Sequence, residues 1–237
     1  MKYFLIGITG KMGSGKSLFS SFFEKRGIPV YSSDKRGKIL MNKIENIRKN
    51  IIKFFGKKSY EKNRLNTNFL SEKVFRDPIA LKLLCSIVHP WVFLDFKNWI
   101  LSQKKTLYFI KESAILFESG AYKNCDLIIT LTSPMKTMIE RVMKRDNLKE
   151  DQILNRLNIQ ISNKNKIKHS NIIIENIQDI SFLEKKAKKI HKEIISKIYK
   201  KNGKRRQKTR RGKIRNKTYG NLRPNPRNAR KKKKNNH

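Results

Sequence analysis

The chain of 237 residues contains 57 Lys and Arg and 18 Asp and Glu. Residues 200–237 contain 18 of the basic residues and no acidic residue. Residues 1–199 therefore contain 39 basic and 18 acidic residues, a net charge of +21. That remaining charge is dispersed, and it gives no ground for inferring nucleic-acid binding by residues 1–199. Two cysteines in apolar surroundings, Cys85 and Cys125, exclude a disulfide framework, and because no apolar run is expected to reach membrane-spanning length, the sequence predicts a soluble cytoplasmic protein without a membrane partner.

The N-terminus joins an apolar run to a glycine-rich motif. Residues 3–8 predict a buried strand, and the following segment Gly10-Lys11-Met12-Gly13-Ser14-Gly15-Lys16-Ser17 fits G-x-x-x-x-G-K-[ST]. In such a loop the backbone N–H groups surround phosphate oxygens, and the next helix directs its positive N-terminal end at the same anion. Lys16 is expected to reach the β- and γ-phosphates of ATP, and the Ser17 hydroxyl is expected to ligate Mg²⁺. The sequence therefore predicts a nucleoside triphosphate site.

Beyond this loop the patterns alternate between strand and helix. The predicted strands cover residues 3–8, 28–31, 106–111, 127–132 and 171–175. The predicted helices cover residues 16–25, 134–145, 149–160 and 180–199, together with a mostly helical insertion over about 35–103 in which Pro78 and Pro90 each start a helix. This alternation predicts an α/β fold in which helices flank a parallel sheet and ligands bind at the carboxyl ends of the strands.

Three charged residues are candidates for the chemistry. Asp34 directly follows the second predicted strand, where its carboxylate can take the proton from an attacking hydroxyl. Two interpretations of Asp34 remain open from position alone: a general base, or the N-cap of the next helix. Arg141 and Arg145 lie one turn apart on a predicted helix, where they either close over the triphosphate or form an exposed charged face.

Several separated segments occur in the order typical of one enzyme family. They are Ile8 to Ser17, Val30 to Asp34, Val74-Phe75, Ile87 to Pro90, Ile115 to Glu118, Arg141 with Arg145-Asp146, Arg156 with Gln160, and Glu175-Asn176. On these segments the chain resembles bacterial dephospho-coenzyme A kinase from Met1 to about Tyr199.

The resemblance implies a P-loop kinase that transfers the γ-phosphate of ATP to the ribose 3′-hydroxyl of dephospho-coenzyme A, giving coenzyme A and ADP, with Mg²⁺ as cofactor. It makes Asp34 the general base. It also makes Lys16, Arg141 and Arg145 catalytic residues. The two arginines belong to a lid over about 134–162. The nucleotide site then comprises Gly10, Gly13, Ser14, Gly15, Lys16, Ser17, Leu18 and Asn176. The helical insertion becomes the acceptor-binding region, to which the resemblance assigns His89, and Glu118 is assigned to the acceptor as well.

Some positions depart from the usual pattern of the family. Ser32 replaces the first acid of an Asp-x-Asp segment, Asn66-Thr67 replaces an Asp-Arg pair, and Ala114 replaces a proline. The lost arginine is expected to weaken contact with the phosphates of the acceptor. A second acid for Mg²⁺ is not obvious, and Glu112 at the end of its predicted strand is the candidate.

The basic tail, residues 200–237, has an order of its own. Gly203 to Ile214, then Thr218-Tyr219-Gly220 and Arg223-Pro224, resemble the small ribosomal-subunit protein Thx over roughly residues 202–227. The resemblance implies a disordered extension that folds on small-subunit ribosomal RNA, with Lys and Arg neutralising phosphates and Tyr219 stacking on a base. A solvated extension with nonspecific affinity for polyanions is the alternative.

Two other functions remain open. The chain is either another P-loop kinase acting on a nucleoside or nucleotide, or chiefly a ribosome-associated RNA-binding protein with a decayed kinase body. The presence of Lys16, Ser17 and Asp34 argues against decay.

Overall fold

The computed structural model describes residues 3–104 and 106–208, with side chains as far as Lys200. The chain forms two compact units, residues 1–188 and residues 189–237. The first unit contains the sheet and the helices around it. In the second unit the described part is the continuation of the last helix.

The centre of the first unit is a five-stranded sheet with the order β2-β5-β1-β6-β7, in which every pair is parallel. Its strands are β1 (Leu5–Thr9), β2 (Val30–Ser32), β5 (Phe109–Glu112), β6 (Leu127–Thr132) and β7 (Ile172–Glu175). The side chains of β1, β5 and β6 are all buried, which explains why β1 and β6 are mostly apolar without an alternating pattern, whereas β5 ends in the buried charged residues Lys111 and Glu112. The predicted α/β fold with a parallel sheet is confirmed.

Helices connect the strands, and one more follows the last strand. They are α1 (Lys16–Glu24), α6 (Met135–Asp146), α7 (Glu150–Ile159), α8 (Asn163–Lys168) and α9 (Ile180–Lys208), with a short 3₁₀ turn, η2 (Ala121–Asn124). The sequence analysis missed α8, whose N-cap hydroxyl, Ser162 Oγ, accepts a hydrogen bond from Asn165 N at 3.3 Å. It also ended α9 too early, at Tyr199. The rest of the predicted tail, residues 209–237, lies outside the described residues.

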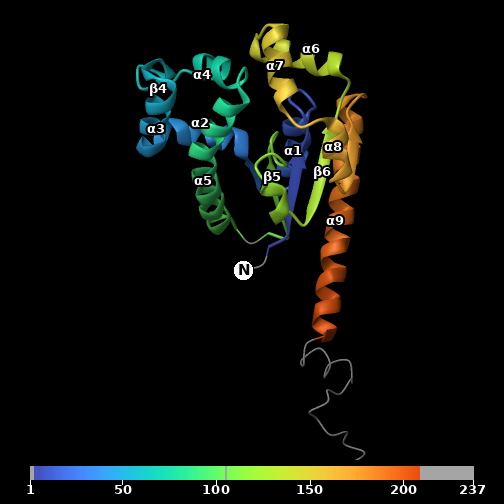
Figure 1. Cartoon of the computed structure of the whole chain (residues 1–237). Helices are drawn as coiled ribbons and strands as arrows, with labels where there is room; N and C mark the ends of the chain where they lie inside the picture. Colours follow the sequence, from blue (N-terminus) through green and yellow to red (C-terminus); the bar gives the residue numbers. More distant parts are fainter. Residues whose placement is uncertain (1–2, 105, 209–237) are drawn as a thin grey trace, which may run out of the picture. The chain divides into compact units, whose positions relative to one another are not determined.

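The predicted insertion is mostly helical, as expected. It contains α2 (Ser33–Lys43), α3 (Glu45–Phe55), η1 (Lys57–Ser59), α4 (Thr67–Val74) and α5 (Pro78–Ser102), and one hairpin of β3 (Tyr60–Glu61) and β4 (Arg64–Leu65). The hairpin was not predicted; its turn needs positive φ at Lys62 (44°) and Asn63 (64°). Figure 1 shows α2 to α5 gathered on the side of β5, α8 on the side of β6, and α6 and α7 at the top of the view.

Helix α5 corrects two expectations. Pro90 does not start a helix but lies inside α5, although an interior proline removes one backbone hydrogen bond and usually kinks a helix. Because the sequence analysis divided this segment at Pro90, it missed a helix of 25 residues that is long and apolar enough to cross a membrane by length and composition. Such a helix is weak evidence for a span, and α5 packs against α2, α3 and α4.

The contact between α5 and α2 includes polar groups. Asp95 of α5 forms an ion pair with Arg36 of α2 and accepts a 2.7 Å hydrogen bond from the Tyr31 hydroxyl of β2. The Arg36 guanidinium holds the pKa of Asp95 below its usual range, because it hydrogen-bonds the ionised carboxylate. Asp95 therefore fixes α5 against β2 and against α2, the helix whose first turn contains Asp34, the predicted base.

Candidate active site

The predicted phosphate loop follows β1 at the carboxyl end of the sheet. Gly10, Gly13 and Gly15 have φ values of 148°, 80° and 94°, which L side chains rarely adopt. A Cβ at these glycines would lie 2.3 Å from Leu131 O, 2.5 Å from Met138 O and 2.2 Å from Asn176 Nδ2, respectively. The backbone conformation therefore requires glycine at all three positions, and packing against backbone atoms also requires it at Gly10 and Gly13. The loop is closed by a 3.1 Å hydrogen bond from Ser14 N to Lys11 O.

Lys16 begins α1 with a buried side chain, 7% exposed. Its ammonium donates a 3.1 Å hydrogen bond to Lys11 O and forms no ion pair with any described residue. Burial lowers the pKa of Lys16, and the charges of Asp34 and Glu112 oppose this shift. A buried ammonium without an ion-pair partner is costly, and the nearby Ser14 Oγ is also buried without a hydrogen-bond partner. An anion bound in the loop would satisfy both groups.

Two oxygens beside the loop suit Mg²⁺. The Ser17 hydroxyl donates a 2.7 Å hydrogen bond to Glu112 Oε1, and Glu112 is a buried residue at the end of β5. Mg²⁺ prefers hard oxygen ligands and usually takes only one or two from protein carboxylates, with water and substrate phosphates filling the other positions. Across residues 3–104 and 106–208 no group of three or more His, Cys, Asp or Glu could hold a metal.

Asp34 lies in the first turn of α2, directly after β2. The N-cap of α2 is Ser32, so the capping interpretation of Asp34 is wrong. Asp34 Oδ2 instead accepts a 3.1 Å hydrogen bond from Ala114 N, a bond that a proline at 114 could not donate. Burial lowers the pKa of Lys16 and of Lys166, and the negative charge of Asp34 opposes this lowering in both. The carboxylate therefore lies within electrostatic range of Lys16.

The two arginines of α6 differ in their surroundings. Arg141 donates to Ser133 Oγ at 3.1 Å, Asn176 O at 3.4 Å and Gly13 O at 3.5 Å, so its guanidinium contacts the phosphate loop. Arg145 forms an exposed ion pair with Asp146 at 2.7 Å. The charge of Arg145 also lowers the pKa of Lys16, which puts it within electrostatic range of the loop.

Residues after β7 and α7 form hydrogen bonds with the backbone of the phosphate loop. Asn176 Nδ2 donates to Ser14 O at 3.0 Å, and Gln160 Oε1 accepts from Met12 N at 3.1 Å. Asn176 therefore supports the loop backbone, whereas Leu18, predicted for the same site, is 38% exposed on α1. Gln160 entered the sequence analysis only through the resemblance, because nothing in its neighbourhood distinguishes it from other glutamines.

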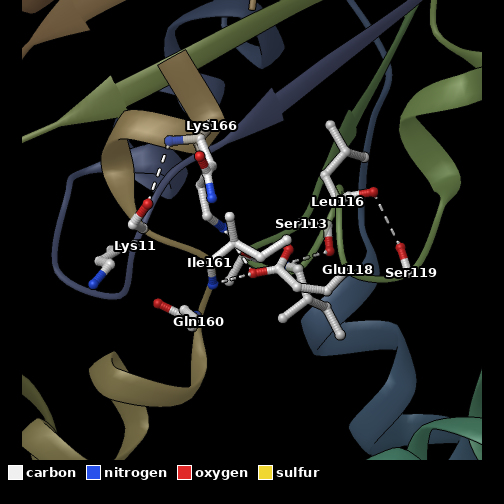
Figure 2. A network of polar contacts seen from close by, with 12 residues as sticks. Lys11, Ser113, Leu116, Glu118, Ser119, Gln160, Ile161 and Lys166 are labelled. Carbon is white, nitrogen blue, oxygen red and sulfur yellow. Dashed lines mark hydrogen bonds and ion pairs between the residues drawn. The ribbon is translucent and has the colours of Figure 1, made fainter. Parts of the chain in front are cut away.

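The two predicted acceptor residues lie on different elements. His89 of α5 has a lowered pKa because of burial and the charge of Lys111, and the charge of Asp34 opposes this shift. His89 thus lies within electrostatic range of the predicted base. Glu118, after β5, forms an ion pair with Lys166 and accepts a hydrogen bond from Ile161 N, as Figure 2 shows. Lys166 was missed by the sequence analysis, since it resembles the many other lysines of a polar segment.

Comparisons with known proteins identify relatives of this chain. A family model described as dephospho-CoA kinase matches residues 4–181. A dephospho-CoA kinase of Bacteroides fragilis is 36% identical over 172 residues, which are 72% of this chain and 83% of that protein. One of Fusobacterium nucleatum is 34% identical over 191 residues, 80% of this chain and 97% of that protein. The solved dephospho-CoA kinase from Campylobacter jejuni is similar with a TM-score of 0.57 and 27% identity, over 80% of this chain and 96% of that one.

Proposed function

Because the chain belongs to the dephospho-CoA kinase family, we propose that it transfers the γ-phosphate of ATP to the ribose 3′-hydroxyl of dephospho-coenzyme A and releases coenzyme A and ADP. One observation carries the proposal: the buried ammonium of Lys16, without an ion-pair partner among the described residues, lies within electrostatic range of the Asp34 carboxylate. A donor phosphate and an acceptor hydroxyl would meet between these groups. Both substrates are water-soluble nucleotides, so we place the reaction in the cytoplasm.

In the proposed reaction each group has one task. Loop amides and Lys16 bind the β- and γ-phosphates. The oxygen of the 3′-hydroxyl attacks the γ-phosphorus while Asp34 accepts the hydroxyl proton and the bond between the γ-phosphorus and ADP breaks. Ser17 and Glu112 would hold Mg²⁺, which when bound neutralises charge on the β- and γ-phosphates. The hydrogen bond from Ala114 N holds one oxygen of Asp34 and orients the carboxylate.

Residues 134–162, which contain α6 and α7, form the proposed lid. Arg141 contacts the loop already, whereas Arg145 has to leave Asp146 to reach a phosphate. An exposed ion pair of this kind contributes only about 0–1 kcal/mol, so the exchange for a triphosphate costs little. Closure of the lid would exclude water, which competes with the 3′-hydroxyl. We assign the insertion, including His89, to the acceptor.

A parallel assay of acceptors tests the substrate. The full chain with ATP and Mg²⁺ is given dephospho-coenzyme A or a nucleoside monophosphate at equal concentration, and ADP formation is measured. We expect kcat/KM for dephospho-coenzyme A to exceed that for each nucleotide by at least roughly a hundredfold, since a site built for one set of polar contacts rejects substrates that leave them unpaired. Faster turnover of a nucleotide would assign the chain to the alternative, a nucleotide kinase.

For the tail we propose binding to small-subunit ribosomal RNA. The support is its composition, with 18 basic residues and no acid in residues 200–237, since each phosphate contact made by Lys or Arg releases counterions. Deletion of residues 209–237 is expected to abolish cosedimentation with small ribosomal subunits while leaving kinase activity unchanged. Equal loss of binding to ribosomal and unrelated RNA would indicate a nonspecific extension, and persistent cosedimentation would place the affinity in residues 1–208.

A further inference from the structure

Lys166 of α8 has a charged side chain that is completely buried, with 0% exposure. Burial lowers the pKa of its ammonium, and the charge and hydrogen bond of Glu118 oppose this shift. Burying an ion is costly unless it is paired and its other hydrogen-bonding positions are filled. The neighbouring Lys164 and Lys168 of the same helix are exposed, so the burial of Lys166 is particular to this position.

The ammonium of Lys166 joins two parts of the segment that follows β5. It donates a 2.6 Å hydrogen bond to Ala114 O and pairs with Glu118 Oε1 at 3.1 Å. The same oxygen of Glu118 accepts a 2.9 Å hydrogen bond from Ile161 N, in the connection between α7 and α8. Figure 2 shows Glu118 directed at Ile161 and Lys166.

Each end of this network leads to the proposed active site. On one side Ala114, whose carbonyl binds Lys166, donates through its N–H to Asp34 Oδ2 at 3.1 Å. On the other side Ile161 follows Gln160, whose Oε1 binds Met12 N of the phosphate loop. Lys166 therefore lies between the predicted base, the end of the lid and the loop.

We propose that Lys166 and Glu118 are positioning residues for the phosphoryl transfer, a role that rests on the proposed function. Lys166 fixes the carbonyl of Ala114 and thereby the N–H that orients Asp34. Glu118 fixes Ile161, where α7 of the lid ends. The pair holds the base and the end of the lid in fixed positions relative to the loop. The acceptor oxygen is thereby aligned with the γ-phosphorus, and water is kept out. Neither side chain needs to touch a substrate.

Lys166→Gln tests the role, with Lys168→Gln on the same helix as the matched control. Misplacement of a reacting group by about 1 Å costs roughly a hundredfold in rate, so we expect kcat of Lys166→Gln to fall by about 10- to 100-fold. The Kd of ATP should stay within about twofold of wild type, because the loop contacts remain. ADP released per acceptor phosphorylated should rise above one, as water reaches the γ-phosphate. A merely structural lysine would lower Tm without changing this ratio.

Glu118→Gln and the double variant with Lys166→Gln complete a double-mutant cycle. Glu118→Gln also tests the proposal by itself if Lys166→Gln does not fold. Two residues acting through one contact should give a double variant whose loss in kcat is clearly smaller than the product of the single losses, and Lys166→Arg should restore part of kcat. The proposal is overturned if Lys166→Gln matches Lys168→Gln in kcat and product ratio. It is also overturned if Glu118→Gln raises only the KM of dephospho-coenzyme A, which would make Glu118 an acceptor ligand. Failure of the proposed function itself would appear separately, as inactivity of the wild-type chain toward dephospho-coenzyme A.

Discussion

Asp34→Asn is expected to lower kcat by at least about a hundredfold while ATP still binds with nearly unchanged affinity. The amide cannot accept the proton of the 3′-hydroxyl, and general-base catalysis contributes roughly 10²–10⁴-fold. Donor binding should survive because the amides of the loop and Lys16 are intact. Steady-state kinetics with dephospho-coenzyme A and calorimetric titration of ATP separate the two effects.

The control for this variant is Glu24→Gln, which makes the same change from carboxylate to amide at an exposed position at the end of α1. It should retain wild-type kcat. Near-normal turnover in Asp34→Asn would show that Asp34 only secures Ala114 N, and the base would have to be sought elsewhere.

Lys16→Met is expected to lower kcat/KM for ATP by at least roughly 10²–10³-fold, the usual cost of removing one donor to a transition-state charge. Unlike Asp34→Asn, this variant should also weaken the binding of ATP itself, since Lys16 is expected to contact the β- and γ-phosphates. Titration of ATP and steady-state kinetics of the variant measure the two losses.

The same substitution should leave the ATP-free protein at least as stable as wild type. Burial lowers the pKa of Lys16, so the folded state disfavours its charged form. The sign follows: Lys16 costs stability at neutral pH, and the cost disappears as pH rises through the lowered pKa toward the ordinary value. Methionine removes the charge and keeps the length, so Tm without ATP should not fall. Lys185→Met, at an exposed lysine of α9, is the control, and a large loss of Tm specific to Lys16→Met would contradict the destabilising effect of this buried charge.

The sheet and the phosphate loop could be predicted because their signals are local. Strands buried on both faces require continuous apolar residues, and the turn of the loop requires glycine where φ is positive, so β1, β6 and the three glycines are visible in the sequence. The same holds for α1, whose Phe19, Phe22 and Phe23 lie at helical spacing and are buried.

Other features depend on contacts that no local pattern reveals. Pro90 was taken as a helix start because proline disfavours a helix interior, whereas α5 continues through it and packs on α2, α3 and α4. Helix α8 has only six residues, too few for a periodic pattern. Asp34 and Ala114 are eighty positions apart in the chain, so neither could be assigned to the other before the fold was known.

Some residues of the site could be predicted from the sequence, and others could not. Glu112 could be named as a candidate metal ligand because it stands at the end of a predicted strand, and the structure brings it to Ser17. Lys166 could not, because a buried lysine and an exposed one have the same sequence signal in a chain with 57 basic residues. Its role follows only from the partners that the fold supplies.

A crystal structure of the full chain with Mg²⁺, dephospho-coenzyme A and a non-hydrolysable ATP analogue would test the central claim most directly. The account predicts that the ribose 3′-oxygen lies within about 2.6–3.2 Å of an Asp34 carboxylate oxygen, in line with the γ-phosphorus held by Lys16 and the loop. A complex in which Asp34 makes no contact with the acceptor, and another group approaches the 3′-hydroxyl, would contradict it.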